Sequence, residues 1–251
     1  METVNPKIVI VGATSAMAEH CARLWVAESP KKMVMLGRDL AKTERVAQDL
    51  RVRSPQSNIE VQTTNFADPI QIQVWVDQVC AAGVPDIVLI AHGTLPDQAS
   101  CQQDLALNQS VLQINGISPV LFAERFTFHM EKANHGKLAI IGSVAGDRGR
   151  KSNYVYGAAK GLVTRYAQGL QHRLAKTQVK VVLIKPGPTA TPMTALLSCK
   201  GQKMADVESV AQAIVQGVAT SSPVVFAPAK WGLIMMVIRH LPRFVFNKMD
   251  I

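Results

Sequence analysis

Short apolar runs alternate along the chain with longer stretches of helical period, and this alternation constrains the fold more than any other feature of the sequence. Seven runs have the length and composition of buried β-strands. They are Lys7–Val11, Met33–Leu36, Ile59–Thr63, Ile87–Ala91, Leu138–Ile141, Val179–Ile184 and Val224–Ala227. Because strands separated by crossover helices pair in parallel, the pattern predicts one parallel sheet.

The stretches between these runs carry the periodicity of helices. Six are long enough to cross over a sheet: Ala16–Ala27, Ala41–Arg51, Ile70–Ala82, Leu112–Lys132, Tyr154–Lys176 and Val207–Thr220. The sequence therefore predicts an α/β fold with a doubly wound, seven-stranded parallel sheet flanked by helices. A chain of 251 residues lies near the upper end of what one hydrophobic core supports, so we expect residues 1–251 to form a single domain.

Two segments depart from the alternation. Residues 186–205 form a long connection containing Pro, Thr and Ser, and the length of this loop indicates a substrate lid. Residues 229–251 contain the apolar run Trp231–Ile238, which is shorter than the roughly 20 residues needed to span a bilayer. We expect this segment to pack against another subunit of a dimer or tetramer, with peripheral contact to a membrane as the alternative.

The net charge and the cysteine content limit which ligands and partners the sequence predicts. The formal net charge of +9 is compatible with a phosphate-bearing cofactor, a phospholipid surface or nucleic acid. Because the basic residues are scattered and no nucleic-acid-binding motif accompanies them, we expect no nucleic-acid partner. The four cysteines form no Cys-x-x-Cys pair, so no metal site is indicated. No apolar segment precedes Lys7, which predicts a cytoplasmic protein, with the inner face of the membrane as a further surface for residues 229–251.

The first two predicted strands end in features typical of dinucleotide binding. After the first, the segment Gly12–Ala18 would form a tight turn into a helix whose N-terminus faces a pyrophosphate, although an ordinary strand-to-helix turn is the alternative because one glycine remains. After the second stands Arg38, which can pair with the 2′-phosphate of NADP(H), so NADP(H) is favoured over NAD(H). The following Asp39 fits a helix N-cap.

Tyr156 and Lys160 are four residues apart in a helical segment, which places both side chains on one face. A tyrosine with an ordinary pKa near 10 is a poor acid–base group at neutral pH, and a neighbouring ammonium is expected to lower that pKa. Ser143 follows an apolar strand, where its hydroxyl could hold a carbonyl oxygen. Asn115 lies in the helical segment Leu112–Lys132. The Tyr–Lys pair alone also fits a solvated helix face.

Taken together, Asn115, Ser143, Tyr156 and Lys160 resemble, in order and spacing, the catalytic tetrad of the short-chain dehydrogenases/reductases. The segments Gly142–Gly146, Tyr156–Lys160 and Lys185–Met193 match the family's strand, active-site and nicotinamide-loop motifs. The resemblance covers nearly the entire chain and implies a Rossmann-type fold. It also implies that Tyr156 protonates a carbonyl oxygen as hydride arrives, that Ser143 orients this carbonyl, and that Lys160 binds the nicotinamide ribose and tunes the tyrosine.

The same resemblance implies a proton relay supported by Asn115. It further implies cofactor contacts at the following residues: Gly12, Thr14, Ser15, Met17, Arg38, Asn65, Phe66, Gly93, Tyr156, Lys160, Pro186, Gly187, Thr189 and Thr191. We expect substrate contacts from His92, Asp147, Arg148 and the loop from Thr191 to Ala205.

Other motifs are similar to one subgroup, the bacterial decaprenylphosphoryl-2-ketoribose reductases. These are the first turn, the segments Ala91–Asp97 and Val144–Arg150, and the apolar tail. The similarity implies reduction of a keto-sugar on a polyprenyl phosphate during cell-envelope biogenesis. A small ketone or a 3-oxoacyl group is the alternative substrate. Because Ala16 and Ala18 stand where the family has further glycines, a dinucleotide-binding sensor or scaffold without turnover is the alternative function.

Overall fold

The computed structural model describes residues 5–195 and 203–249, and within them seven strands form one parallel sheet. The order is β3-β2-β1-β4-β5-β6-β7, so the chain winds outward in both directions from β1 and β4. This confirms the doubly wound parallel sheet predicted from the sequence. The strands are β1 (Lys7–Val11), β2 (Lys32–Leu36), β3 (Asn58–Gln62), β4 (Ile87–Ile90), β5 (Lys137–Ile141), β6 (Lys180–Pro186) and β7 (Val224–Ala227).

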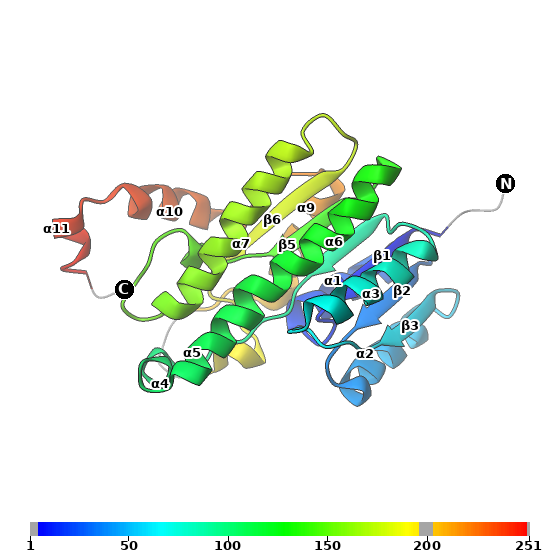
Figure 1. The fold of residues 1–251 in the computed structure, drawn as a ribbon, viewed down its shortest axis with the longest axis horizontal. Coiled ribbons are helices and arrows are strands. Elements are labelled where there is room, and N and C mark those ends of the chain that lie inside the picture. The colour runs from blue at the N-terminus through cyan, green and yellow to red at the C-terminus, as the bar shows by residue number, and fades with distance from the viewer. Residues whose placement is uncertain (1–4, 196–202, 250–251) are drawn as a thin grey trace.

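Helices cover both faces of the sheet (Figure 1). Because side chains alternate along a strand, Val9 and Val11 enter one apolar core, while Ile8 and Ile10 enter the other. The first core lies under α3 (Pro69–Ala81), α6 (Ser118–Ala133) and α7 (Tyr154–Arg173). The second lies under α1 (Ala16–Glu28), α2 (Leu40–Arg53) and α9 (Val207–Ala219). Burial on both faces explains why the central strands β1, β4, β5 and β6 are nearly continuous apolar runs.

The segment before α6 differs from the expected single helix over Leu112–Lys132. The structure contains α4 (Gln98–Gln103), α5 (Leu105–Leu112) and a π-helical turn, η1 (Gln113–Ile117), that leads directly into α6. Asp97 and Asp104 begin the two short helices, since each side chain accepts hydrogen bonds from two backbone N–H groups of the first turn. The prediction of one helix was therefore wrong over its first third.

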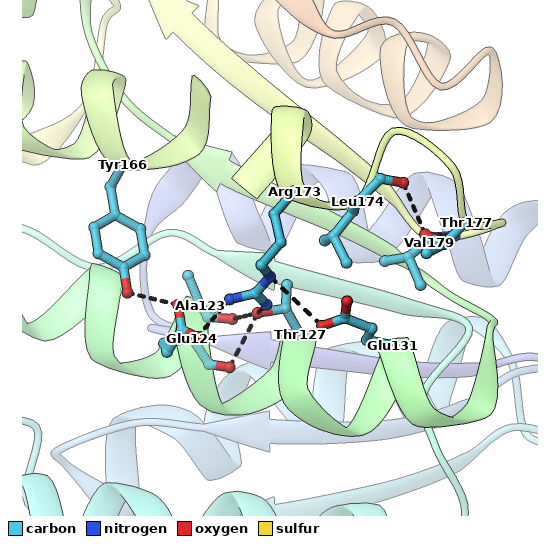
Figure 2. Close-up of polar contacts among 9 residues, drawn as sticks. All are labelled: Ala123, Glu124, Thr127, Glu131, Tyr166, Arg173, Leu174, Thr177 and Val179. Atoms are coloured by element: carbon cyan, nitrogen blue, oxygen red, sulfur yellow. Dashed lines mark hydrogen bonds and ion pairs between the residues drawn. The ribbon is translucent and has the colours of Figure 1, made fainter. Parts of the chain in front are cut away.

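A polar layer joins α6 to α7, the helix that carries Tyr156 (Figure 2). Glu124 accepts a hydrogen bond from the Tyr166 hydroxyl at 2.6 Å and another from Arg173 at 2.6 Å. Arg173 also donates to the Thr127 hydroxyl at 3.1 Å. At the end of α7 the Thr177 hydroxyl donates to the Leu174 carbonyl, which closes the turn into β6. These contacts fix the two helices relative to one another.

Residues 229–249 form two helices that project from the body of the molecule (Figure 1). They are α10 (Lys230–His240) and α11 (Arg243–Phe246). Leu233, Val237 and Phe244 are more than half exposed. No helix in the part of the chain described by the structure is long and apolar enough to cross a membrane.

Candidate active site

Several of the predicted site residues follow strands of the parallel sheet. Gly12, Gly93, Ser143 and Gly187 come shortly after β1, β4, β5 and β6. Because parallel strands all end at the same edge, these four positions meet at the carboxyl edge of the sheet, close to the reversal of strand order between β1 and β4. This is where ligands bind in open α/β sheets.

Ser143, Tyr156 and Lys160 meet at the end of β5. Ser143 begins the 3₁₀ turn η2 (Val144–Gly146), and its Oγ accepts a hydrogen bond from the Ala145 N–H at 3.1 Å. Ser143 lies close enough to the Tyr156 hydroxyl to lower the pKa of the phenol. One helical turn further along α7, the Lys160 Nζ donates to the Ile141 carbonyl at 2.9 Å. The structure therefore brings these three members of the predicted tetrad together.

Glycines allow η2 to lie directly on the backbone of α7. A Cβ at Gly146 would stand 2.6 Å from the Lys160 carbonyl carbon and oxygen. A Cβ at Gly157 would stand 2.9 Å from the Ala145 carbonyl oxygen. Since carbon atoms essentially never approach backbone this closely without displacement, the missing side chains set the spacing between Ser143 and Tyr156.

Asn115 lies in the π-helical turn η1, and its side chain is fully buried. Its Oδ1 accepts a hydrogen bond from the Thr94 N–H at 2.9 Å, and its Nδ2 donates to the Val111 carbonyl at 3.0 Å. A Cβ at Gly93 would stand 2.7 Å from Oδ1. Asn115 thus holds the loop after β4 against η1.

Burial controls the pKa values of the Tyr–Lys pair. It raises the pKa of Tyr156 to about 12, against a lowering effect from the Ser143 hydrogen bond. It lowers the pKa of Lys160 to about 8. We expected the ammonium to bring the tyrosine pKa down, and this was wrong for the structure as it stands. The Lys160 Nζ lies 5.8 Å from the Tyr156 ring centroid and its hydrogen bond goes to Ile141, so desolvation dominates.

The first turn can approach a cofactor closely despite its single glycine. Gly12 has φ +87°, and a Cβ there would stand 2.6 Å from the His92 nitrogen. Ala18 is fully buried, so the core accommodates its methyl group inside α1. Thr14 is exposed and Met17 half-buried, while Ser15 precedes α1 without a side-chain cap on the first-turn N–H groups. The N–H groups of the first turn of α1, which no side chain caps, are the donors that would hold a pyrophosphate.

The residues predicted to bind the adenosine end of the cofactor differ in their exposure. Arg38 is exposed, and within the described chain its guanidinium forms no hydrogen bond or ion pair. Asp39 caps α2 through the Lys42 N–H at 3.0 Å, which confirms the structural role expected for it. Asn65 is exposed and accepts from the Ala67 N–H. The Phe66 ring is buried in the core, 4.9 Å from the His92 ring, so a cofactor can reach Phe66 only through its backbone.

The Pro186–Thr191 segment begins at the end of β6. Gly187 donates to the Ala227 carbonyl, and a Cβ at Gly187 would stand 1.9 Å from the indole nitrogen of Trp231. Thr189 is nearly buried, and its hydroxyl donates to the Gly187 carbonyl. Thr191 begins a short 3₁₀ turn, η3 (Pro192–Thr194). Residues 196–202 of the expected lid lie outside the described residues.

The expected substrate contacts are only partly engaged within the protein, because the His92 Nδ1 and the Asp147 Oδ2 are buried without a hydrogen-bond partner. Asp147 forms an ion pair with Lys185, and both side chains are buried. The sequence did not predict this pair. The Arg148 guanidinium donates to the Ile238 and Leu241 carbonyls and stacks 3.8 Å from the Phe246 ring centroid. The His92 Nε2 is 2.9 Å from the Ser118 hydroxyl.

Sequence reasoning also missed three polar side chains beside Tyr156. Gln98, Arg150 and Asn153 each carry a buried polar atom without a hydrogen-bond partner. Arg150 lies inside a motif noticed in the sequence, but no periodicity distinguishes it from Arg148.

Known proteins are similar to this chain in sequence and in fold. A family model described as short chain dehydrogenase matches residues 6–200. An uncharacterized oxidoreductase from Streptomyces coelicolor is 30% identical over 249 residues, covering 96% of this chain and 95% of its own. One from Mycobacterium tuberculosis is 30% identical, covering 99% and 98%. A solved short-chain dehydrogenase from Sphingobium yanoikuyae in complex with NADPH superposes with a TM-score of 0.81 at 19% identity, covering 95% and 97%.

Proposed function

Because the chain belongs to the short-chain dehydrogenase family and is an oxidoreductase of that type, we propose that it reduces a carbonyl to an alcohol with NADP(H). The observation that carries this proposal is that Ser143, Tyr156 and the buried Lys160 lie together at the end of β5.

The reaction follows from the positions of these side chains. The Gly12 turn and the Pro186–Thr191 segment would hold the reduced nicotinamide cofactor, which would supply the hydride for the carbonyl carbon. The Ser143 hydroxyl orients the carbonyl oxygen. Tyr156, protonated at neutral pH because its pKa is about 12, gives its proton to that oxygen, so one hydride and one proton convert the carbonyl to an alcohol. Ser143, which lowers the Tyr156 pKa, stabilises the phenolate left on Tyr156, and Lys160 would hold the nicotinamide ribose. Asn115 holds the loop that contains Gly93. We also assign to Asn115 the support of a proton relay.

We propose NADP(H) rather than NAD(H) because Arg38 is exposed at the end of β2 without an acidic partner in the described part of the chain. Arg38→Ala is expected to weaken NADPH binding by about 10-fold or more while leaving NADH binding unchanged, since only NADPH carries the 2′-phosphate. Energy transfer from protein to nicotinamide fluorescence measures both affinities. Arg45→Ala, at an exposed position on α2, is the matched control. Absence of binding by either nucleotide would count against the reductase.

The substrate we propose is a keto-sugar on a polyprenyl phosphate, in cell-envelope biogenesis. The motifs of the sequence support it, together with the exposed apolar residues of α10 and α11. A small ketone or a 3-oxoacyl group is the alternative. Transfer of deuteride from labelled NADPH to each class of carbonyl compound tests the proposal, and binding without transfer would instead support a dinucleotide-binding sensor or scaffold.

We further propose that α10 and α11 pack against another subunit of a homo-oligomeric cytoplasmic enzyme. Leu233 is 66% exposed and Phe244 71% exposed, and clustered apolar side chains of this size mark contact surfaces. Leu233→Glu is expected to lower the molar mass measured by light scattering after size exclusion. Peripheral membrane contact would be favoured instead if the mass were unchanged and the wild-type protein bound anionic vesicles in a flotation assay. Arg239 and Arg243 supply positive charge for such contact.

A further inference from the structure

The segment 147–153 joins the two halves of the active site. It begins directly after η2, whose first turn is capped by Ser143, and ends at α7, which carries Tyr156. Besides the Asp147 Oδ2, three buried atoms in this segment and in the neighbouring α4 lack a hydrogen-bond partner: the Arg150 Nε, the Asn153 Oδ1 and the Gln98 Nε2. Buried polar atoms are nearly always paired, so unpaired ones beside a reactive group indicate a missing ligand.

Backbone contacts hold these side chains at the first turn of α7. The Gln98 Oε1 accepts a hydrogen bond from the Val155 N–H at 3.1 Å, and Val155 is the residue before Tyr156. The Asn153 carbonyl accepts from the Gly157 N–H at 2.8 Å, and the Asn153 N–H donates to the Arg150 carbonyl at 3.2 Å. The three unpaired atoms therefore belong to residues fixed around the N-terminal end of the helix that presents Tyr156.

Arg150 differs from the other buried or half-buried cations of this region. Lys185 pairs with Asp147, and Arg148 donates to two backbone carbonyls. For Arg150, in contrast, burial lowers the pKa of the guanidinium, and no carboxylate in the described chain opposes this effect. A partly buried cation without a counter-ion is destabilising. Such a cation is useful where a bound ligand supplies the counter-ion.

We propose that Arg150 and Gln98 bind an oxyanion carried by the carbonyl substrate, and that Asn153 accepts a hydrogen bond from a neighbouring substrate hydroxyl. The guanidinium and the Gln98 amide are donors, as a phosphate requires, while the Asn153 Oδ1 is an acceptor, as a hydroxyl requires. This inference rests on the proposed reductase function and gives its substrate class: a phosphorylated hydroxy-ketone. The phosphate belongs either to a soluble sugar phosphate or to a lipid-linked one.

Calorimetric titration of the NADPH-loaded full-length protein tests the subsite, because bound NADPH already fills the cofactor's own phosphate site. Glycerol 3-phosphate is expected to bind at least about 10-fold more tightly than glycerol, and Arg150→Gln to remove about 10- to 100-fold of the phosphate affinity. Arg165→Gln, at an exposed position on α7, is the matched control and is expected to change nothing. Farnesyl phosphate distinguishes the two sources, since tighter binding than glycerol 3-phosphate identifies a lipid-linked substrate and equal binding a soluble one.

A stability measurement separates a ligand-binding arginine from a structural one. Because the Arg150 Nε is buried without a partner, Arg150→Met is expected to raise the Tm of the protein without ligand by about 2–4 °C. A structural arginine would instead lower it. A lower Tm in Arg150→Met, no preference for glycerol 3-phosphate over glycerol, or an equal loss in Arg165→Gln would overturn the subsite.

The experiments distinguish a failure of the proposed subsite from a failure of the proposed reductase function. Deuteride transfer to neutral ketones, with no Arg150-dependent phosphate binding, would uphold the reductase and overturn the subsite. Arg150-dependent binding with no transfer to any phosphorylated ketone would uphold the subsite and overturn the reductase.

Discussion

Tyr156→Phe is expected to lower kcat for NADPH-dependent carbonyl reduction by about 100- to 10,000-fold, the usual contribution of a positioned general acid. The phenylalanine ring keeps the packing of α7 but has no proton to give. NADPH affinity is therefore expected to remain within about 2-fold of the wild-type value, because the change removes transition-state stabilisation rather than binding. Stopped-flow measurement of NADPH oxidation at saturating substrate gives kcat, and fluorescence titration gives the affinity.

Tyr154→Phe is the matched control, because Tyr154 lies on the same helix and is 43% exposed. We expect it to leave kcat unchanged. Equal kcat values for the wild type and Tyr156→Phe would remove Tyr156 from the mechanism. A second readout concerns Lys160, whose pKa of about 8 predicts that kcat/KM for reduction falls above pH 8 while Tyr156 stays protonated.

Gly146→Ala is expected to damage stability and catalysis together. The new Cβ would stand 2.6 Å from backbone atoms of Lys160 and 2.8 Å from the Gly161 nitrogen, and neither can move away as the end of a side chain can. The turn η2 must therefore lift from α7 and carry Ser143 away from Tyr156. We expect a loss of about 1–3 kcal/mol in the free energy of unfolding, measured by urea denaturation, and a kcat reduced by at least about 10-fold.

Gly149→Ala is the control for this experiment. Gly149 lies in the same segment, is exposed, and an added Cβ there meets nothing within 4 Å. Its stability and kcat are expected to match those of the wild type. If Gly146→Ala retained both, the close packing of η2 on α7 would not be what positions Ser143.

Hydrophobic periodicity was sufficient to predict the sheet. The central strands are buried on both faces, so their apolar runs are nearly unbroken, and β1 and β7 have the bounds expected from the sequence. The region before α6 could not be predicted in this way. There Asp97 and Asp104 start short helices by capping them, and the π turn η1 continues into α6 without a break in hydrophobicity.

The tetrad could be predicted because its spacing is itself the signal, whereas the substrate side could not. Arg148 and Arg150 are two residues apart and chemically identical in the sequence. Only the tertiary structure shows that Arg148 is held by the backbone of α10, while the Arg150 Nε is buried without a partner. The pKa of Tyr156 was likewise beyond sequence reasoning, because it depends on how completely the phenol is desolvated.

The contact between Gly187 and Trp231 limits how this protein can diverge. The indole of α10 occupies the space that any side chain at position 187 would need, since a Cβ there would stand 1.9 Å from the indole nitrogen. Substitutions at the two positions are therefore coupled: a descendant could acquire a side chain at 187 only after losing the aromatic ring at 231. Exchange of the tail beyond residue 229 for that of a relative with a different residue at 231 would repack the Pro186–Thr191 segment. The tail and the Pro186–Thr191 segment must therefore change together.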